Sequence, residues 1–233
     1  MSITRFQRVE KKYLLNEEEY HQVLEELSPY LVEDEYFQSH IYNIYFDTTG
    51  NDLIIKSLEK PKFKNKIRLR SYGIPQEDSK VFLEVKQKYK GIVGKRRIET
   101  TLKEFYYFYE KKETEESKSQ IQKEMTYYFQ KYSLEPKLFL AYDRVSYKGK
   151  NNPGLRVTFD SNIRSRKTEL RLELGDGGEP LFSDHSYVME IKTLNALPLE
   201  ITRILSRLKV YPTTFSKYGK IYQKNKKEEL RYV

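Results

Sequence analysis

Charged side chains alternate with apolar ones in four short segments of the chain, and most of these charges are positive. The segments are Lys66–Arg70, Phe82–Lys88, Leu155–Asp160 and Val188–Lys192. Arginine can bind two oxygens of a phosphate with its planar guanidinium, and lysine adds a compact positive charge. A glutamate among them could hold a hard divalent cation, which prefers oxygen ligands. These residue types can therefore bind a polyanion without a nucleophilic side chain.

The spacing of these residues separates the two kinds of side chain, because successive side chains of a strand point to opposite faces. One face receives the apolar residues Ile67, Leu69, Leu83, Val85, Leu155, Val157, Phe159, Met189 and Ile191. The other receives Arg68, Arg70, Lys86, Lys88, Arg156 and Lys192, together with Glu84, Asp160 and Glu190. Nothing selects one sign of charge on an ordinary solvated face. The repetition of Arg and Lys predicts an anion site built by the sheet itself.

The composition limits the kind of site. The 233 residues include no cysteine and three histidines, so disulfides and thiolate metal sites are excluded and any metal ligands should be carboxylates. A net charge of +9 suits nucleic acid, an anionic membrane or a polyanionic small molecule. Residues 16–35 contain eight acids and no Lys or Arg, so positive charge is concentrated in the strand-like segments.

No apolar run approaches the ~20 residues of a membrane span, and the N-terminal residues lack the apolar core of a signal peptide. We therefore expect a soluble, cytoplasmic protein without a membrane segment in this chain. No internal repeat or Gly/Ser-rich linker divides the sequence, which predicts a single domain over residues 1–233.

Periodicity and turn residues predict the elements that must position the charges. Strands are expected at 6–15, 40–47, 64–72, 80–89, 92–101, 138–147, 154–160, 169–174 and 186–193. Helices are expected over 16–30 and 197–208 and at both ends of 103–132. The mixed charge run at 110–118 indicates a solvated helix or a mobile loop, and a basic segment at 217–227 closes the chain.

Short turns between consecutive strands indicate antiparallel pairing. Strands with one charged and one apolar face can form an open sheet with helices on its apolar face, or a barrel with a charged lumen. The number of strands favours closure. The expected fold class is α+β, mainly β: an antiparallel β-barrel tunnel with a charged lumen, flanked by helices. A lumen of like charges requires counter-anions, so closure implies a polyanionic ligand.

Nine short motifs occur in the order seen in VTC domains. They are Arg8-x-Glu10-x-Lys12-Tyr13, Ile44-Tyr45-Phe46-Asp47-Thr48, Lys66-x-Arg68-x-Arg70, Glu84-x-Lys86, Lys95-Arg96-Arg97, Tyr142-x-Arg144, Leu155-Arg156-x-Thr158-x-Asp160, Glu190-x-Lys192 and Phe215-Ser216-Lys217-Tyr218. From residue 5 to about residue 222 the chain resembles the VTC-domain polyphosphate polymerases, of the triphosphate tunnel metalloenzyme (CYTH-like) superfamily.

The resemblance implies a tunnel enzyme that transfers the γ-phosphate of ATP to a growing polyphosphate chain, with Mn²⁺ or Mg²⁺ as cofactor. Its partners would be ATP and polyphosphate or pyrophosphate, and not nucleic acid. Carried over by position, the residues along the phosphate path would be Lys12, Arg68, Arg70, Lys86, Arg144 and Arg156, of which Arg68, Arg70, Lys86 and Arg144 would bind ATP. Glu190 would ligate the metal, Lys192 would lie beside it, and Lys217 would close the tunnel wall near the transferred phosphoryl group.

The first motif departs from the hydrolytic and cyclase-like members of the superfamily, which begin with Glu-x-Glu-x-Lys. Here Arg8 replaces the first carboxylate. This substitution weakens the case for a second metal or a water-activating site and favours a phosphotransferase. A tripolyphosphatase or nucleoside triphosphatase on the same scaffold stays the alternative, and a single assay of the products separates the two.

Two other functions and several structural roles remain open. A nucleic-acid-binding module would fit the pI of about 9.3, although the basic residues follow strand parity and no RNP-like or helix-turn-helix signature occurs. A non-catalytic phosphate-chain sensor would be expected to lack the metal carboxylate, and Glu190 is present. Ion pairing with neighbouring strands is the expected role of Glu84, Glu10 and Asp160. The three histidines, His21, His40 and His185, are expected at the surface.

Overall fold

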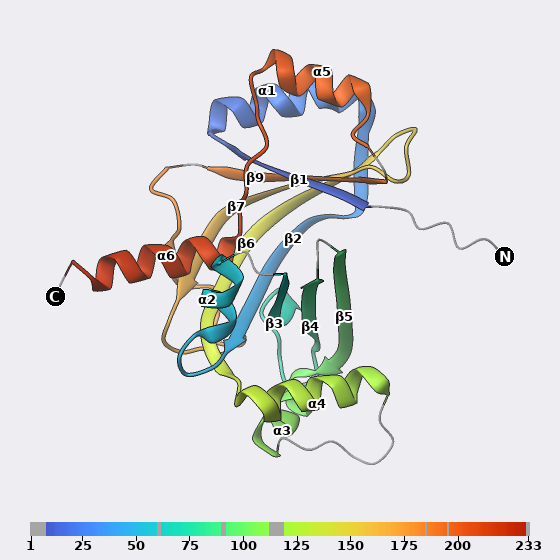
Figure 1. The fold of residues 1–233 in the computed structure, drawn as a ribbon. Helices are drawn as coiled ribbons and strands as arrows, with labels where there is room; N and C mark the ends of the chain where they lie inside the picture. Colours follow the sequence, from blue (N-terminus) through green and yellow to red (C-terminus); the bar gives the residue numbers. More distant parts are fainter. Residues whose placement is uncertain are drawn as a thin grey trace. The chain divides into compact units, whose positions relative to one another are not determined.

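The computed structural model describes residues 8–59, 62–89, 92–111, 119–184, 186–194 and 196–231 (Figure 1). Its strands are β1 (Arg8–Leu15), β2 (Leu31–Asp47), β3 (Phe63–Tyr72), β4 (Lys80–Tyr89), β5 (Ile92–Thr101), β6 (Glu135–Gly149), β7 (Arg156–Arg166), β8 (Glu179–Pro180) and β9 (Tyr187–Leu194). Its α-helices are α1 (Glu17–Leu27), α2 (Asp52–Leu58), α3 (Leu102–Lys111), α4 (Gln120–Tyr132), α5 (Leu199–Arg207) and α6 (Lys217–Glu229). The predicted charge run at 110–118 lies mostly outside the described residues.

The strands form a sheet in the order β1-β9-β7-β6-β2-β3-β4-β5, and β8 pairs with β7 at one side of this path. The pairs β1–β9, β7–β9, β2–β3, β3–β4 and β4–β5 are all antiparallel. The prediction of a mainly β, antiparallel α+β fold with flanking helices is confirmed. Among the described residues the path begins at β1 and ends at β5, so hydrogen bonds do not close the sheet.

The chain divides into two compact units, each with its own core. Unit 1 comprises the described residues up to His40, Tyr142–Ile163 and Phe182–Phe215. Unit 2 comprises Ile41–Ala141, Arg164–Leu181 and the described residues from Ser216 onward.

Helices α1 and α5 lie side by side on one face of β1 and β9 in unit 1 (Figure 1). The core between them contains the alternate residues of the strands, such as Tyr13, Val157 and Ile191, which are at most 3% exposed. Asn16 begins α1 with a capping box, in which its side chain accepts from the backbone N–H of Glu19. Because these apolar residues are buried on one face, the residues between them in each strand must point to the opposite face.

Unit 2 repeats this arrangement with different elements. Its core joins Ile67 and Leu69 of β3 and Val85 of β4 to the aromatic face of α3 and α4, including Phe105 and Phe129. These three strand residues are at most 1% exposed. The predicted separation of apolar and charged parities is therefore confirmed on β3 and β4.

The strand predicted at 169–174 is wrong, because this segment is a loop. Leu170 and Leu172 pack on the core of unit 2 and so reproduce the alternation of a strand, but Glu169 has a φ of 49° and Gly175 a φ of 82°. The Arg166 guanidinium donates to the backbone carbonyls of Glu169, Arg171, Gly175 and Gly177. These bonds satisfy carbonyls that a neighbouring strand would otherwise bind.

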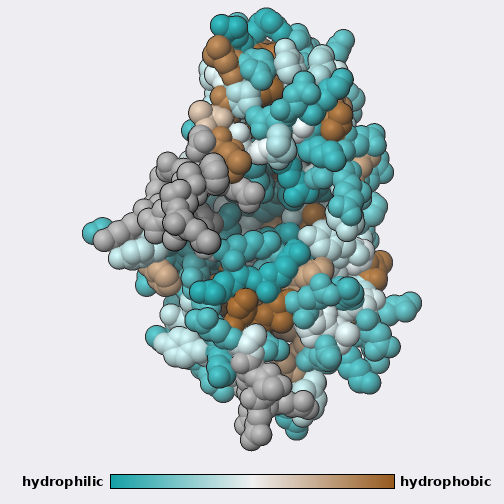
Figure 2. All heavy atoms as spheres, turned by 90° about the vertical axis from the view of Figure 1, so that its right-hand side faces the viewer, coloured by the Kyte–Doolittle hydropathy of each residue, from teal (hydrophilic) through white to brown (hydrophobic). Residues whose placement is uncertain are grey.

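The surface is predominantly hydrophilic on the face drawn in Figure 2, where hydrophobic residues form only small separate groups. Exposed large apolar side chains such as Tyr36, Tyr211 and Leu199 are distributed over several elements. Among the described helices, we find none long and apolar enough to span a bilayer.

Candidate functional site

Unit 1 carries charged side chains on the strand face opposite to its core. The register places them in two cross-strand rows, in the order β1, β9, β7: Lys12–Glu190–Thr158 and Glu10–Lys192–Arg156. Between β1 and β9 each acid lies opposite a lysine, so both carboxylates have a cationic neighbour, whereas Lys192 and Arg156 are neighbouring cations. We call the group Glu10, Lys12, Arg144, Asp160, Glu190 and Lys192 the Glu190 cluster.

Glu190 lies at the centre of this cluster and is 9% exposed. Its Oε1 is 3.2 Å from the Lys192 Nζ, and the Glu10 carboxyl lies within hydrogen-bonding reach. Lys12 Nζ is 3.4 Å from Glu10 Oε1 and donates to the Phe215 carbonyl at 3.2 Å. Two carboxylates and two lysines thus lie together on neighbouring strands.

Arg144 of β6 is held by Asp160 of β7. Its Nε and Nη2 donate to the two carboxylate oxygens at 2.6 and 2.8 Å, and Asp160 is fully buried. Burial would lower the pKa of Arg144, but Asp160, Tyr142 and Glu190 raise it well above its usual value. The guanidinium is therefore permanently charged and fixed in orientation within the Glu190 cluster.

Arg156, on the charged face of β7, is held by an acid of β2. Its Nε lies 3.0 Å from Asp34 Oδ2 and 3.1 Å from the Ser146 hydroxyl, and its side chain is 47% exposed. Asp34 belongs to the first half of β2, which the sequence did not predict to be a strand. Arg156 is the most exposed of the four predicted phosphate-path arginines.

The cations of the Glu190 cluster keep Glu190 ionised. Burial opposes ionisation, but Lys192, Lys12 and Arg144 together hold the pKa of Glu190 well below its usual range. Glu190 and Glu10 could supply two hard oxygen ligands, and Mg²⁺ or Mn²⁺ needs one or two when phosphates complete the coordination. Among the described residues no three His, Cys, Asp or Glu side chains group as metal ligands. The site therefore fits a metal that arrives with a phosphate ligand.

Unit 2 carries a second charged group around Glu84 of β4, which is 2% exposed. Its Oε2 lies 2.6 Å from Arg68 Nη2 and 3.9 Å from Arg70 Nε. Its Oε1 lies 2.8 Å from both Lys95 Nζ and Arg97 Nε on β5. Burial opposes ionisation of Glu84, but Arg68, Arg70 and Lys95 hold its pKa well below the usual range. We call these five residues the Glu84 cluster; they support the pairing role predicted for Glu84.

Polar residues of β2 extend the Glu84 cluster. Arg70, 6% exposed, donates from Nε to Asn43 Oδ1 at 3.0 Å, and Asn43 in turn donates to a backbone carbonyl. Arg68 donates from Nη1 to the Tyr45 hydroxyl at 3.2 Å. Lys66 donates to the Ser216 hydroxyl at 2.7 Å, next to the first residue of α6. The cations of β3 are thus oriented from both neighbouring strands and from α6.

The two remaining predicted residues also lie in unit 2. Lys86 is exposed and stands between Lys66 and Lys95 in the register of β3, β4 and β5. Lys217 is half-buried and is the first residue of α6. The structure therefore groups the predicted site residues as Lys12, Arg144, Arg156, Glu190 and Lys192 in unit 1, and Arg68, Arg70, Lys86 and Lys217 in unit 2.

Three contributors were not among the predicted site residues. Lys95 and Arg97 share the parity of the charged face, and this signal could have identified them. Tyr45 could not be found in this way, because its contact with Arg68 depends on the pairing of β2 with β3. Of the histidines, His40 lies 2.8 Å from Asp143 on the surface, His21 is exposed, and His185 lies outside the described residues.

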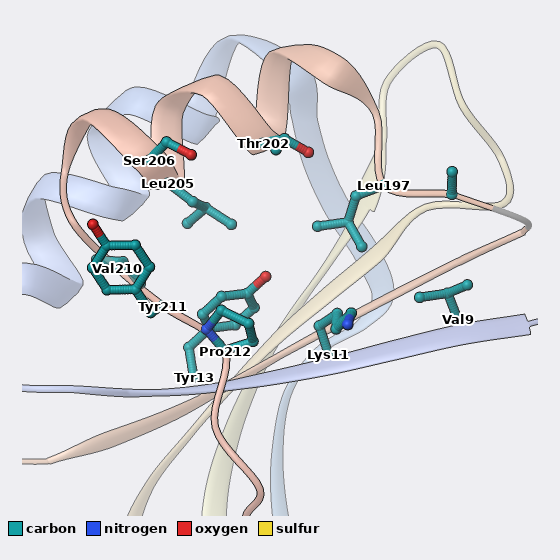
Figure 3. A pocket seen from close by; sticks show the side chains of 11 residues that line it. Val9, Lys11, Tyr13, Leu197, Thr202, Leu205, Ser206, Val210, Tyr211 and Pro212 are labelled. Carbon is teal, nitrogen blue, oxygen red and sulfur yellow. The ribbon is translucent and has the colours of Figure 1, made fainter. Parts of the chain in front are cut away.

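A groove of about 500 Å³ in unit 1 lies apart from the Glu190 cluster (Figure 3). It lies between α5 and the face of β1 that carries Val9, Lys11 and Tyr13, and Leu197 and Leu205 point into it. Because Glu10 and Lys12 have the opposite parity, the groove is on the other side of β1 from the Glu190 cluster. Its lining is mostly apolar and includes one cation, Lys11, so it does not suit a polyphosphate ligand.

Comparison with known proteins gives a family match over nearly the whole chain. The model of a family described as the VTC domain matches residues 7–225, which include both charged clusters. No curated protein matches.

The fold also resembles solved structures at low sequence identity. A candidate adenylate cyclase from Bacillus halodurans has a TM-score of 0.54 and 13% identity, with 90% of this chain and 93% of that chain covered. A candidate adenylate cyclase from Vibrio parahaemolyticus has a TM-score of 0.48 and 13% identity, with coverages of 93% and 98%. A protein from Pyrococcus horikoshii has a TM-score of 0.45 and 17% identity, with coverages of 94% and 99%. At such identities the Bacillus structure supports the fold and no particular activity.

Proposed function

Because the chain belongs to the VTC domain family, we propose that it transfers the γ-phosphate of ATP to a growing polyphosphate chain. The family and the fold support an enzyme that handles triphosphates, and the synthesis of polyphosphate is the finer proposal. The observation that carries it is Glu190, a buried carboxylate kept ionised among Lys12, Lys192 and Arg144. A carboxylate with a lowered pKa is a weak base, so this cluster suits alignment of phosphates better than activation of water.

Transfer of a phosphoryl group requires mainly positioning and neutralisation of the charge spread over its oxygens. Arg144 and Arg68 are prepared for this by Asp160 and Glu84, which fix their guanidinium planes. We assign phosphate binding to Lys12, Arg68, Arg70, Lys86, Arg144, Arg156 and Lys217, with Lys192 beside the metal ligand. The resemblance assigns Arg68, Arg70, Lys86 and Arg144 to ATP; of these, Arg68, Arg70 and Lys86 share unit 2.

Glu190, with Glu10 beside it, would hold Mn²⁺ or Mg²⁺. When bound, the cation would neutralise charge on the phosphate oxygens that it contacts. Lys12 and Lys192 would balance the two carboxylates before the metal and phosphate bind.

The test is incubation of the purified protein with ATP and Mn²⁺, followed by gel detection of polyphosphate and assay of orthophosphate. We expect products many phosphates long. Release of orthophosphate without chains would instead establish the hydrolase alternative. No consumption of ATP with either Mn²⁺ or Mg²⁺ would contradict both functions.

Phosphate-rich ligands should also stabilise the folded protein. They neutralise cations that are brought together only in the folded state, and a ligand at a hundred times its dissociation constant stabilises by about 2.7 kcal/mol. The measurement is the thermal midpoint with tripolyphosphate against chloride at matched ionic strength. Equal shifts from the two salts would contradict a specific site, because screening alone would then account for the effect.

A further inference from the structure

A buried phenol lies among the cations of the Glu84 cluster. Tyr45 on β2 is opposite Arg68 on β3 and is 7% exposed. Its hydroxyl accepts from Arg68 Nη1 at 3.2 Å, whereas Arg68 Nε and Nη2 are held by Glu84 Oε2 at 2.8 and 2.6 Å. The Arg68 guanidinium is therefore fixed on one side by a carboxylate that stays ionised and on the other by a phenol that can change its charge.

The Tyr45 ring is itself held in place. It stacks on Tyr218 of α6 with ring centroids 4.6 Å apart and an interplanar angle of 28°. The Tyr218 hydroxyl donates a hydrogen bond to Asp47 Oδ2 at 3.2 Å. Asp47 also accepts hydrogen bonds from the backbone N–H groups of Leu53 and Ile54 in α2. A ring packed in this way keeps its hydroxyl beside Arg68 in either protonation state.

The groups that face Tyr45 favour its ionisation. Burial alone would raise its pKa, but Arg68, Lys66 and Arg70 of β3 lower the pKa of Tyr45 to about 8. From α6 it meets Tyr218, whose pKa is raised by burial and by Asp47, so that Tyr218 stays neutral. On β4, Glu84 lies opposite Arg68 and is already paired with Arg68 and three further cations, and Lys86 lies opposite Lys66.

A second phenol lies at the rim of the same cluster. Tyr72 of β3 is about half exposed, and its hydroxyl accepts from Arg97 Nη2 at 3.2 Å. Burial would raise its pKa, but Arg70 and Arg97 lower it. Tyr45 differs because it is buried and faces three cations of β3.

We propose that Tyr45 is a positioning residue that couples phosphate binding at the Glu84 cluster to the uptake of a proton. As a neutral phenol it holds Arg68 and leaves the positive charge of the cluster intact for a phosphate chain. As a phenolate it neutralises part of that charge and competes with the phosphate. Binding converts phenolate and one proton from water into phenol. This inference rests on the proposed function, because it requires that the cluster bind phosphate groups.

The sign of the pH dependence follows from this coupling. A bound phosphate chain disfavours the phenolate, so the complex holds more protons than the free protein and a rise in pH releases the ligand. Between about pH 7 and about pH 9, one unit either side of the pKa of Tyr45, the affinity should fall by about tenfold. Tyr45→Phe cannot ionise, so this part of the loss should disappear.

The experiment is calorimetric titration of the metal-free protein with tripolyphosphate at these two pH values. The proteins are the wild type, Tyr45→Phe and Tyr127→Phe, which removes an exposed phenol paired with Lys131 on α4. Ionisation of tripolyphosphate itself affects all three proteins equally and cancels in the comparison. We expect wild type and Tyr127→Phe to lose about tenfold more affinity than Tyr45→Phe, and tyrosinate absorbance of the wild type to decrease when ligand is added at about pH 9.

The outcomes separate this inference from the proposed function. If wild type and Tyr45→Phe lose affinity equally, with binding intact at about pH 7, the inference is wrong and the proposed function is untouched. If the wild type does not bind tripolyphosphate at about pH 7, the assignment of phosphate binding to the cluster is wrong, and the inference is wrong with it. Should Tyr45→Phe fail to fold, unchanged tyrosinate absorbance of the wild type on ligand binding at about pH 9 would still overturn the inference.

Discussion

Replacement of Glu190 with glutamine is expected to lower metal-dependent turnover of ATP by about 100-fold or more while metal-free ATP binding is retained. Glutamine keeps the size and a hydrogen-bonding oxygen, but it removes the charge that a hard cation requires. The substitution also leaves Lys192 without its carboxylate partner at 3.2 Å, which adds positive charge to the Glu190 cluster. Loss of turnover should therefore come from the metal and not from weaker phosphate binding.

The measurements for Glu190→Gln are polyphosphate synthesis over a range of Mn²⁺ concentrations and calorimetric ATP affinity without metal. Glu229→Gln, which changes an exposed acid paired with Lys167, is the matched control and should behave as the wild type. Synthesis at the wild-type rate by Glu190→Gln would show that Glu190 is not the metal ligand. Glu10 and Glu84 would then be the carboxylates to test.

Arg70→Ala should give the opposite pattern. Arg70 is buried beside Asn43 and Glu84, and its loss should weaken the binding of every polyphosphate whether or not metal is present. A charge-assisted hydrogen bond contributes about 1.5–3 kcal/mol, which corresponds to about 10–100-fold in affinity. Arg171→Ala, which removes an exposed arginine, is the control and should bind polyphosphate as the wild type does. Unchanged affinity in a folded Arg70→Ala protein would remove Arg70 from the site.

Strand positions and the charged face could be predicted because both depend on local spacing. The predicted segments 80–89 and 92–101 coincide with β4 and β5, and Ile67 and Leu69 are buried as their parity indicates. The prediction of a strand at 169–174 is wrong because Leu170 and Leu172 contact the core at alternate positions, a pattern that a loop can have as well as a strand. Nothing local reveals that Arg166 binds the carbonyls of that segment.

Partners across the sheet could not be predicted, because they depend on register between segments distant in sequence. Lys12 lies opposite Glu190, and the pairing of β1 with β9 creates this row. Arg156 pairs with Asp34 because β2 begins at Leu31, nine residues before the predicted start at residue 40. The segment 32–39 is acidic and largely exposed, so it lacks the alternation that marks a half-buried strand. Residue types thus identified the chemistry, whereas the tertiary fold determined the pairs.

Glu84→Gln should destabilise the protein and at the same time strengthen its response to polyphosphate. Removing one partner of a buried ion pair costs about 3–5 kcal/mol, because the remaining charges stay buried without compensation. Glu84 contacts four cations, but Lys95 and Arg97 are 48% and 35% exposed and can be solvated. We therefore expect the free energy of unfolding at about pH 7 to fall by about 3 kcal/mol, the lower end of this range.

The pH dependence of this loss identifies its cause. The pKa of Glu84 is lower in the folded protein than its ordinary value of 4.5, so its ionisation stabilises the fold above that pH. This stabilisation decreases as the pH falls below 4.5 toward the folded pKa. The difference between wild type and Glu84→Gln should therefore be full at neutral pH and shrink in acid. A difference that is constant with pH would indicate a packing defect instead.

The response to ligand distinguishes a charge-balancing Glu84 from a merely structural one. Without this carboxylate the cluster keeps Arg68, Arg70, Lys95 and Arg97 and has a larger excess of positive charge. Tripolyphosphate should then raise the thermal midpoint of Glu84→Gln by more than it raises that of the wild type. Glu229→Gln, whose exposed carboxylate pairs with Lys167, serves as control and should change stability by no more than about 0.5 kcal/mol. An equal or smaller ligand shift in Glu84→Gln would mean that phosphate does not take the place of the missing carboxylate, and the Glu84 cluster would then be a structural ion network.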